Sequence, residues 1–329
     1  MAALEERYPR ARIELITDAA DRVPPWMLEG RVAQRTLALR RGPDAWRRPG
    51  DSERGASLGA LAKDWATAPP DVLLFAVDLT DPIFRLLADE LAKAAANAWR
   101  AGLAYGRGPF AELHAVIEPG PTTEHESVRL LRLAAAVGAH SGFRLPRVPR
   151  APSPLAPWPG PTLVVHPGAS RPTKRWPLAR WGELAARLSA EGIRTVVVGD
   201  QADHEHVPDL GIDFDDGALV DRVGALDLLG LAAVLGGADA FAGNDSFPFH
   251  LATAAGTPAL VLVGPGADRW SAYPADHVTV LREPVICSPH AGEECPVYTS
   301  CSHGACMLSI RLETVVNAVR GALPSPRAR

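Results

Sequence analysis

The sequence has very little lysine, and it has no apolar segment long enough to cross a membrane. Only three of its 34 basic residues are lysine (Lys63, Lys93 and Lys174), so a lysine in a loop is unusual in this chain. The best apolar run, Pro258 to Gly264, has the length of a strand, whereas a membrane helix needs about 20 residues. The first residues include acids and lack the apolar region of a secretory signal. We therefore expect a cytoplasmic protein without a transmembrane segment.

The sequence also lacks an excess of positive charge. Its formal net charge is −4 and its pI is about 6.2, which gives no indication of a nucleic-acid partner. Hydrophobic residues make up 47% and charged residues 22%, and these ordinary globular proportions exclude wholesale disorder. A length of 329 residues predicts two domains at about 150 residues each.

A proline-rich stretch from Leu145 to Pro161 divides the sequence. It has neither helical nor strand periodicity, so it is predicted to be an interdomain linker. On both sides, apolar runs alternate with amphipathic helical patterns, which is typical of parallel sheets covered on both faces. We predict an α/β fold with two Rossmann-like domains, residues 1–150 and 151–329. The expected strands are 12–16, 36–39, 72–79, 163–166, 195–199, 238–243, 259–264 and 278–281, and helices are expected at 81–96, at 126–137 and from Pro177.

The segment HPGASRPTKRWP, residues 166–177, follows one of the expected strands. Its glycine turn, its serine and its lysine together suit an anionic phosphate, because backbone N–H groups and an ammonium converge there. The alternative is a surface loop with solvated basic residues. The scarcity of lysine elsewhere favours a function for Lys174.

The segment GNDSFPFHLATAAGTP, residues 243–258, also begins at the end of an expected strand. Asp245 and Ser246 precede a helix that carries His250, and they are typical N-cap residues. Capping and ligand binding are compatible, since spare N–H groups at a helix start attract anions. His250 could donate to a phosphate, although a histidine taken alone is more often a structural residue.

These two segments, in this order and at this spacing, resemble the donor-binding half of glycosyltransferase family 9, the bacterial heptosyltransferases. The Gly199-Asp200…Glu205 turn and Gly264-Pro265 match in the same register. The resemblance implies the GT-B fold, with two facing Rossmann-like domains and the nucleotide-sugar donor held mainly by the C-terminal one. It implies a metal-independent displacement at the anomeric carbon, in which Lys174 acts as a catalytic residue that stabilises the departing nucleoside diphosphate. The donor-binding residues that it implies are Ser170, Lys174, Glu205, Asp245, Ser246 and His250.

Two features depart from the family pattern. Phe247 stands where the family usually has glycine, so the geometry or the identity of the donor is open. The chain also opens at the approach to the second strand, whereas family members begin with an apolar strand and a Gly-Asp loop that supplies the general base. We therefore expect either a start codon assigned too late or a substitute base such as Asp78, at the end of the strand-like run PDVLLFAVDLT.

All four cysteines lie in one short stretch: Cys287, Cys295, Cys301 and Cys306. Many family members have a comparable cluster, and in some it binds iron, so the resemblance implies a structural zinc or iron site. The spacings do not match a standard zinc finger, and reduced thiols or a disulfide are the alternatives.

The sequence thus predicts an inverting heptosyltransferase-type enzyme that uses a nucleotide-diphosphate sugar, ADP-heptose, and an acceptor that is unknown. No cofactor is predicted to be required for catalysis. The alternatives are a non-catalytic nucleotide-sugar-binding homologue, or another GT-B enzyme such as a sugar-nucleotide epimerase.

Overall fold

The structure is a computed structural model, and it describes most of the chain. The helices and strands fall into two compact units, one of residues Met1–Pro121 with Glu126–Arg144 and the other of Thr122–His125 with Leu145–Arg329. The chain therefore divides directly before the proline-rich stretch, which belongs to the C-terminal unit together with the short segment Thr122–His125. The described residues are 2–17, 32–36, 58–76, 82–103, 113–118, 124–215, 217–266, 268–287, 295 and 301–324.

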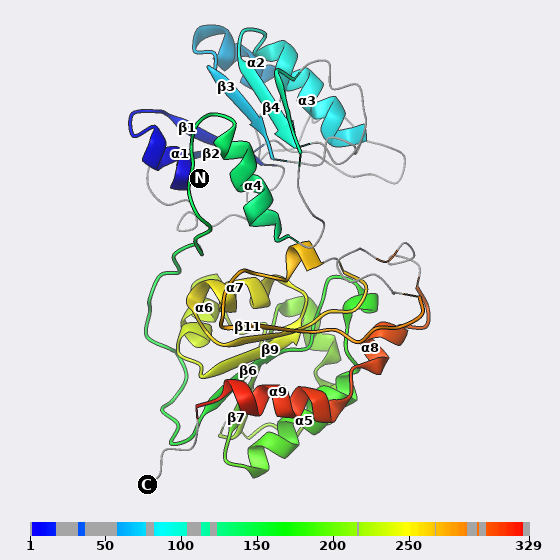
Figure 1. The fold of residues 1–329 in the computed structure, drawn as a ribbon. Helices are drawn as coiled ribbons and strands as arrows, with labels where there is room; N and C mark the ends of the chain where they lie inside the picture. Colours follow the sequence, from blue (N-terminus) through cyan, green and yellow to red (C-terminus); the bar gives the residue numbers. More distant parts are fainter. Residues whose placement is uncertain are drawn as a thin grey trace. The chain divides into compact units, whose positions relative to one another are not determined.

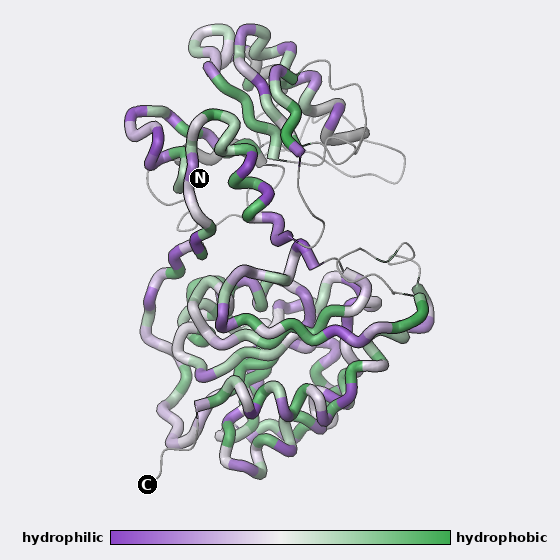
Figure 2. The backbone as a smooth tube through the Cα atoms, viewed as in Figure 1, coloured by the Kyte–Doolittle hydropathy of each residue, from purple (hydrophilic) through white to green (hydrophobic). Residues whose placement is uncertain are grey.

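The C-terminal unit is built on a six-stranded, fully parallel sheet with the strand order β11-β10-β9-β6-β7-β8. Its central strands form because continuous runs of valine, leucine, alanine and phenylalanine bury both faces, and they stand out as apolar in Figure 2. The order changes direction between β6 and β9, which is where open sheets of this kind bind ligands, at the carboxyl ends of the strands. The strands are β6 (Thr162–His166), β7 (Arg194–Gly199), β8 (Leu219–Val223), β9 (Ala240–Asn244), β10 (Ala259–Leu262) and β11 (Val278–Leu281).

Helices cover both faces of this sheet. Helices α5 (Leu178–Ala190) and α9 (Leu312–Ala322) pack against each other on one face, and α6 (Leu228–Gly236) and α7 (Phe247–Ala255) lie together on the other (Figure 1). Trp176 and Trp181 are fully buried among the helix and strand side chains and meet edge to face at 5.0 Å. The remaining elements of this unit are η3 (Pro172–Lys174), η4 (Gln201–His206), η5 (Pro208–Leu210), η6 (Asp268–Trp270) and α8 (Ala305–Ser309).

The N-terminal unit also has parallel strands. In its described residues β3, β4 and β5 form one sheet and β1 pairs with β2. Leu61, Trp65 and Phe75 lie in an apolar cluster between helices and strands. The elements are α1 (Ala2–Arg7), β1 (Ile13–Thr17), β2 (Val32–Thr36), α2 (Leu58–Thr67), β3 (Val72–Phe75), α3 (Pro82–Ala94), β4 (Trp99–Leu103), β5 (Ala115–Ile117) and α4 (Glu126–Ala135).

The predicted α/β class with parallel sheets is confirmed in both units. Strand β2 begins earlier than the predicted strand at 36–39, whose later positions lie outside the described residues. None of the described helices combines the length and the apolar character that crossing a bilayer requires.

Candidate functional site

Lys174 and Asp245 form a close ion pair at the carboxyl edge of the C-terminal sheet. Lys174 ends the short helix η3 after β6, and Asp245 directly follows β9. The Lys174 Nζ donates to Asp245 Oδ2 at 2.7 Å and lies 3.4 Å from the Asp245 carbonyl oxygen. The lysine side chain is 16% exposed and the aspartate side chain 4%. The ammonium therefore reaches the surface, while the carboxylate lies beneath it.

Asn244 fixes the loop that carries this lysine. Its side chain is fully buried, and its amide nitrogen donates to the carbonyl oxygens of Pro167 and Gly168 at 2.6 and 3.2 Å. Its amide oxygen accepts from the Trp176 N–H at 3.1 Å. One side chain thus satisfies three backbone groups of a loop that has no strand or long helix of its own. The position of Lys174 follows from this clamp.

The glycine-containing loop after β10 lies against the ion pair. A Cβ atom at Gly266 would lie 2.9 Å from Asp245 Oδ2, so the backbone passes too close for a side chain. Arg282, next to the end of β11, donates to the carbonyl oxygens of Gly264 and Gly266 at 2.8 and 2.6 Å and pairs with Asp268. The loop is therefore held in place over Asp245.

The N-terminus of α7 opens at the same edge. Ser246 occupies the N-cap position in extended conformation, but its side chain makes no capping hydrogen bond. Phe247 and Pro248 follow as the first helical residues, and Phe247 is 43% exposed. The helix dipole places partial positive charge at this end. Together with Lys174, it makes the edge suitable for an anionic ligand.

An aromatic cluster borders the ion pair. His250 Nδ1 lies 3.0 Å from the Tyr273 hydroxyl, and the His125 ring packs against the Tyr273 ring with centroids 3.8 Å apart. Burial, with a contribution from Asp245, raises the pKa of Tyr273 to about 12. Burial lowers the pKa of His250 despite the nearby Asp245, and Lys174 lowers it further. Burial and the neighbouring His250 lower the pKa of His125 to about 4.

These shifts assign protons near pH 7. Both histidines are neutral and Tyr273 keeps its hydroxyl proton. The tyrosine can therefore donate to His250 Nδ1, which leaves the ring proton on Nε2. His250 is then a neutral donor close to Lys174 and Asp245.

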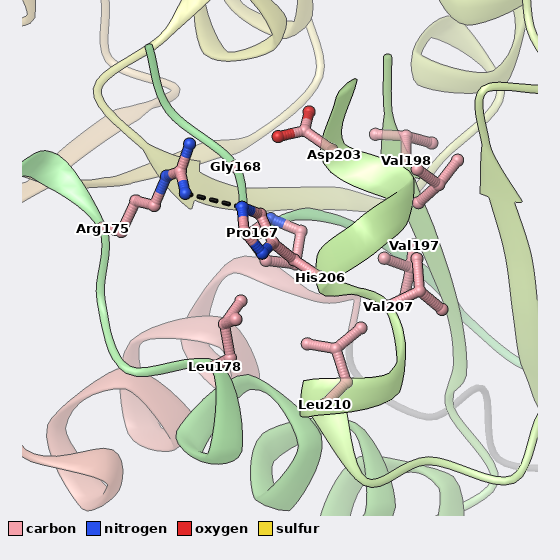
Figure 3. Close-up of a pocket in the computed structure, with 11 residues that line it drawn as sticks. Pro167, Gly168, Arg175, Leu178, Val197, Val198, Asp203, His206, Val207 and Leu210 are labelled. Carbon is pink, nitrogen blue, oxygen red and sulfur yellow. Dashed lines mark hydrogen bonds between the residues drawn. The ribbon is translucent and has the colours of Figure 1, made fainter. Parts of the chain in front are cut away.

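A small pocket lies beside the Pro167-Gly168 turn (Figure 3). Arg175 Nη1 is 2.8 Å from His206 Nε2 at this pocket, and Arg175 also donates twice to the Ala169 carbonyl. The ion pair of Lys174 is not part of its lining. The lining residues are Pro167, Gly168, Arg175, Leu178, Val197, Val198, Asp203, His206, Val207, Leu210 and Val223.

The structure brings together four of the residues predicted for the donor site: Lys174, Asp245, Ser246 and His250. Ser170 is an exposed residue of the loop after β6. Glu205 is also exposed, with 77% of its side chain accessible and a 3.6 Å contact to His206. Asp78 lies outside the described residues.

Sequence reasoning missed several residues of this site. Asn244 stood in the quoted motif but was not chosen, and the signal that pointed to it is an asparagine at the end of an apolar strand. Asp203 and Arg282 had no such signal, because their contacts are with segments far away in the sequence. Asp203 Oδ2 lies 3.3 Å from His166 Nε2, whereas the predicted Glu205 on the same turn is exposed and contacts His206.

The four cysteines are free in the structure. Cys295 and Cys306 are buried, Cys301 is half-buried and Cys287 is exposed. Burial raises the pKa of the Cys306 thiol, and the nearby Cys301 and Cys287 raise it further. Among the residues that the structure describes, no three histidine, cysteine or acidic side chains come together as metal ligands. These residues do not fit a zinc or iron ion as placed, and the metal site stays a prediction.

The geometry and the fold define a class of protein: a two-unit α/β protein of the GT-B type. Its fold matches that of E. coli ADP-heptose LPS heptosyltransferase II, with a TM-score of 0.66, 17% identity, and coverage of 98% of this chain and 92% of that one. A family 9 glycosyltransferase from Veillonella parvula gives a TM-score of 0.67 at 16% identity, over 98% and 90% of the two chains. At these identities the comparison shows the fold, and the predicted GT-B architecture is confirmed.

The sequence comparisons give the family. Residues 140–299 match the model of glycosyltransferase family 9 (heptosyltransferase). Over 106 residues the chain is 38% identical to lipopolysaccharide heptosyltransferase 1 of Pseudomonas aeruginosa, covering 32% of this chain and 29% of the relative. Over 126 residues it is 30% identical to lipopolysaccharide heptosyltransferase 2 of Escherichia coli, covering 37% and 36%. The matching segments span about a third of these curated relatives.

Proposed function

We propose that this protein is a glycosyltransferase that transfers a heptose from ADP-heptose to a hydroxyl acceptor, with inversion at the anomeric carbon. One observation carries the proposal. Lys174 lies at the open N-terminus of α7, paired with a buried aspartate and covered by the Gly264–Gly266 loop. This is the arrangement expected for the diphosphate of a nucleotide sugar.

The proposed reaction is a single displacement. The acceptor hydroxyl oxygen attacks the anomeric carbon, the bond from that carbon to the diphosphate oxygen breaks, and negative charge develops on the nucleoside diphosphate. Lys174 and the first amides of α7 would stabilise that charge, and His250 would donate a further hydrogen bond through Nε2. The residue that takes the acceptor proton is not assigned, since Asp78, which the sequence predicted for it, lies outside the described residues.

The choice of donor draws on the relatives. The curated relatives are named lipopolysaccharide heptosyltransferases, and one structural neighbour is described as an ADP-heptose enzyme. The Lys174 ammonium and the N-terminus of α7 support an anionic group at this edge independently of those names. We place the reaction in the cytoplasm, and we leave the acceptor as a hydroxyl compound of unspecified class.

Titration calorimetry with ADP, UDP and ADP-heptose tests the donor site. We expect ADP and ADP-heptose to bind and UDP to bind more weakly. A coupled assay for released ADP then tests transfer once candidate acceptors are added. Binding without release from any acceptor would favour a non-catalytic homologue, and interconversion of donor sugars without an acceptor would favour an epimerase. Failure to bind any of the three nucleotides would refute the proposal.

A second prediction concerns the ribose. We propose that Glu205 hydrogen-bonds a ribose hydroxyl, as the family resemblance implies. Because its side chain is 77% exposed, Glu205→Ala should change the free energy of unfolding by less than about 0.5 kcal/mol. We expect affinity for ADP to fall by roughly tenfold, the magnitude of one hydrogen bond to a charged group. Unchanged ADP affinity in calorimetry would remove Glu205 from the site.

A further inference from the structure

His166 joins Ser246 to Asp203 across the carboxyl edge of the sheet. His166 is the last residue of β6, Ser246 precedes α7, and Asp203 lies in η4. The Ser246 Oγ is 2.8 Å from His166 Nδ1, and Asp203 Oδ2 is 3.3 Å from His166 Nε2. The His166 side chain is 6% exposed and therefore has little access to water.

The surrounding backbone leaves room for the Asp203 carboxylate in this position. A Cβ at Gly168 would lie 2.3 Å from Asp203 Oδ1, and a Cβ at Gly199 would lie 2.8 Å from Oδ2. Asp203 Oδ2 also accepts from the Asp200 N–H at 3.2 Å, as half of the capping box that begins η4. The two glycines and the capping box thus hold the carboxylate against His166.

The carboxylate determines which ring nitrogen carries the proton. Burial raises the pKa of Asp203, but the hydrogen bond with His166, the Asp200 amide and the nearby Arg175 outweigh burial, so the pKa ends below its usual range. Asp203 is therefore an anion at neutral pH and only accepts hydrogen bonds. A His166 ring that carries one proton then holds it on Nε2, facing the Asp203 carboxylate, and its Nδ1 is an acceptor.

This tautomer fixes the direction of the Ser246 hydroxyl. Ser246 has one hydroxyl proton, and His166 Nδ1 takes it in a hydrogen bond. The same hydroxyl oxygen makes no capping bond to α7. Its lone pairs are left for a ligand, and Ser246 is half-buried, so one side of it reaches the surface. An acceptor is unfavourable next to a phosphate oxygen and favourable next to a hydroxyl group.

We propose that Ser246 accepts a hydrogen bond from a hydroxyl group of the donor sugar, with His166 and Asp203 as positioning residues that fix the polarity of its hydroxyl. This inference rests on the proposed function, because it assumes a nucleoside-diphosphate sugar at this strand edge. The proposal divides the binding of the donor between two groups of residues. Lys174 and the backbone of α7 bind the diphosphate, and the Ser246 hydroxyl binds the sugar.

Calorimetry with two probes, ADP and ADP-heptose, tests the inference. Because ADP lacks the sugar, Ser246→Ala and His166→Asn should each weaken ADP-heptose binding roughly tenfold and ADP binding less than twofold. Ser246→Thr, which keeps the hydroxyl, should restore the wild-type preference for ADP-heptose. His204→Asn is the matched control, since His204 is an exposed histidine of η4, the element that also carries Asp203. It should alter neither affinity.

The outcomes distinguish the inference from the function on which it rests. Equal losses for ADP and ADP-heptose would assign Ser246 to the diphosphate, and this would overturn the inference alone. The inference alone would also be overturned if the wild-type protein binds ADP-heptose no more tightly than ADP. If the wild-type protein binds neither probe, both proposals fall.

A measurement on the wild-type protein without ligand keeps the inference testable even if the variants do not fold. In wild-type protein labelled with ¹⁵N at histidine, NMR should show the His166 proton on Nε2 at neutral or mildly basic pH, with Nδ1 accepting a hydrogen bond. The Nδ1 resonance should shift in Ser246→Ala. A His166 proton found on Nδ1 would overturn the inference regardless of any binding result.

Discussion

Lys174→Ala is expected to lower the affinity for ADP by about 100-fold. Under the proposed function, the variant loses a charge-assisted hydrogen bond from Lys174 to the diphosphate, which contributes about 1.5–3 kcal/mol. It also leaves the Asp245 carboxylate, now unpaired, to repel the same diphosphate. Calorimetry at fixed ionic strength measures the loss. Lys63→Ala, which removes an exposed lysine of α2, is the control and should bind ADP as the wild type does.

The ion pair adds a stability effect that must be separated from binding. Asp245 is 4% exposed, so removing its partner leaves a buried charge and lowers the free energy of unfolding. The double variant Lys174→Met with Asp245→Asn removes both charges and should regain most of that stability. Its ADP affinity should stay low. Recovery of affinity together with stability would show that Lys174 only supports the fold.

Asn244→Asp is expected to destabilise the protein by roughly 3–5 kcal/mol at pH 7. The substitution keeps the shape of the side chain but replaces the amide donor with a carboxylate oxygen. That oxygen would face the carbonyls of Pro167 and Gly168, with no water available because the site is fully buried. Urea denaturation measures the change. Asn317→Asp, at an exposed position of α9, is the control and should lie within about 0.5 kcal/mol of wild type.

The same variant should depend on pH in a defined direction. Burial and the two carbonyls raise the folded-state pKa of the new aspartate above its unfolded value of about 3.9. Protonation therefore favours the folded state, and a protonated carboxyl group can donate to the Pro167 carbonyl. The destabilisation relative to wild type should shrink as the pH falls from 7 to 4. A difference that is constant over this range would contradict the assigned contacts of Asn244.

The sequence indicated the parts of the fold that depend on local pattern. Runs such as those of β6 and β10 are continuous and apolar because both faces are covered, so their composition alone predicts them. Strand β8 was missed, since it is an edge strand whose sequence LVDRV includes an acid and a base. Strand β4, with the sequence WRAGL, was also missed, because its arginine and glycine interrupt the apolar pattern.

A site residue was predictable only where it stands in a recognisable local motif of the sequence. Lys174 and Asp245 each stood in a motif that follows a strand. The partner of His166 was not predictable, because whether Asp203 or Glu205 faces the ring depends on the 3₁₀ geometry of η4. The clamp of Asn244 likewise requires β6 and β9 to be neighbours in the sheet, which an alternation of strands and helices does not specify.

The contact between the Gly264 loop and helix α8 means that the segment that contains Cys306 supports this loop. A Cβ at Gly264 would lie 2.4 Å from the sulfur of Met307 and 3.0 Å from that of Cys306, so the helix forms the floor under the loop. The Trp176 indole N–H, which donates to the Ile310 carbonyl, ties the lysine loop to the end of the same helix. The loop that carries Lys174 and the loop that contains Gly264 therefore both pack against the α8 segment. Oxidation or alkylation of Cys306 would add volume beneath the Gly264 loop and would displace the loops around Lys174 and Asp245 without touching either residue.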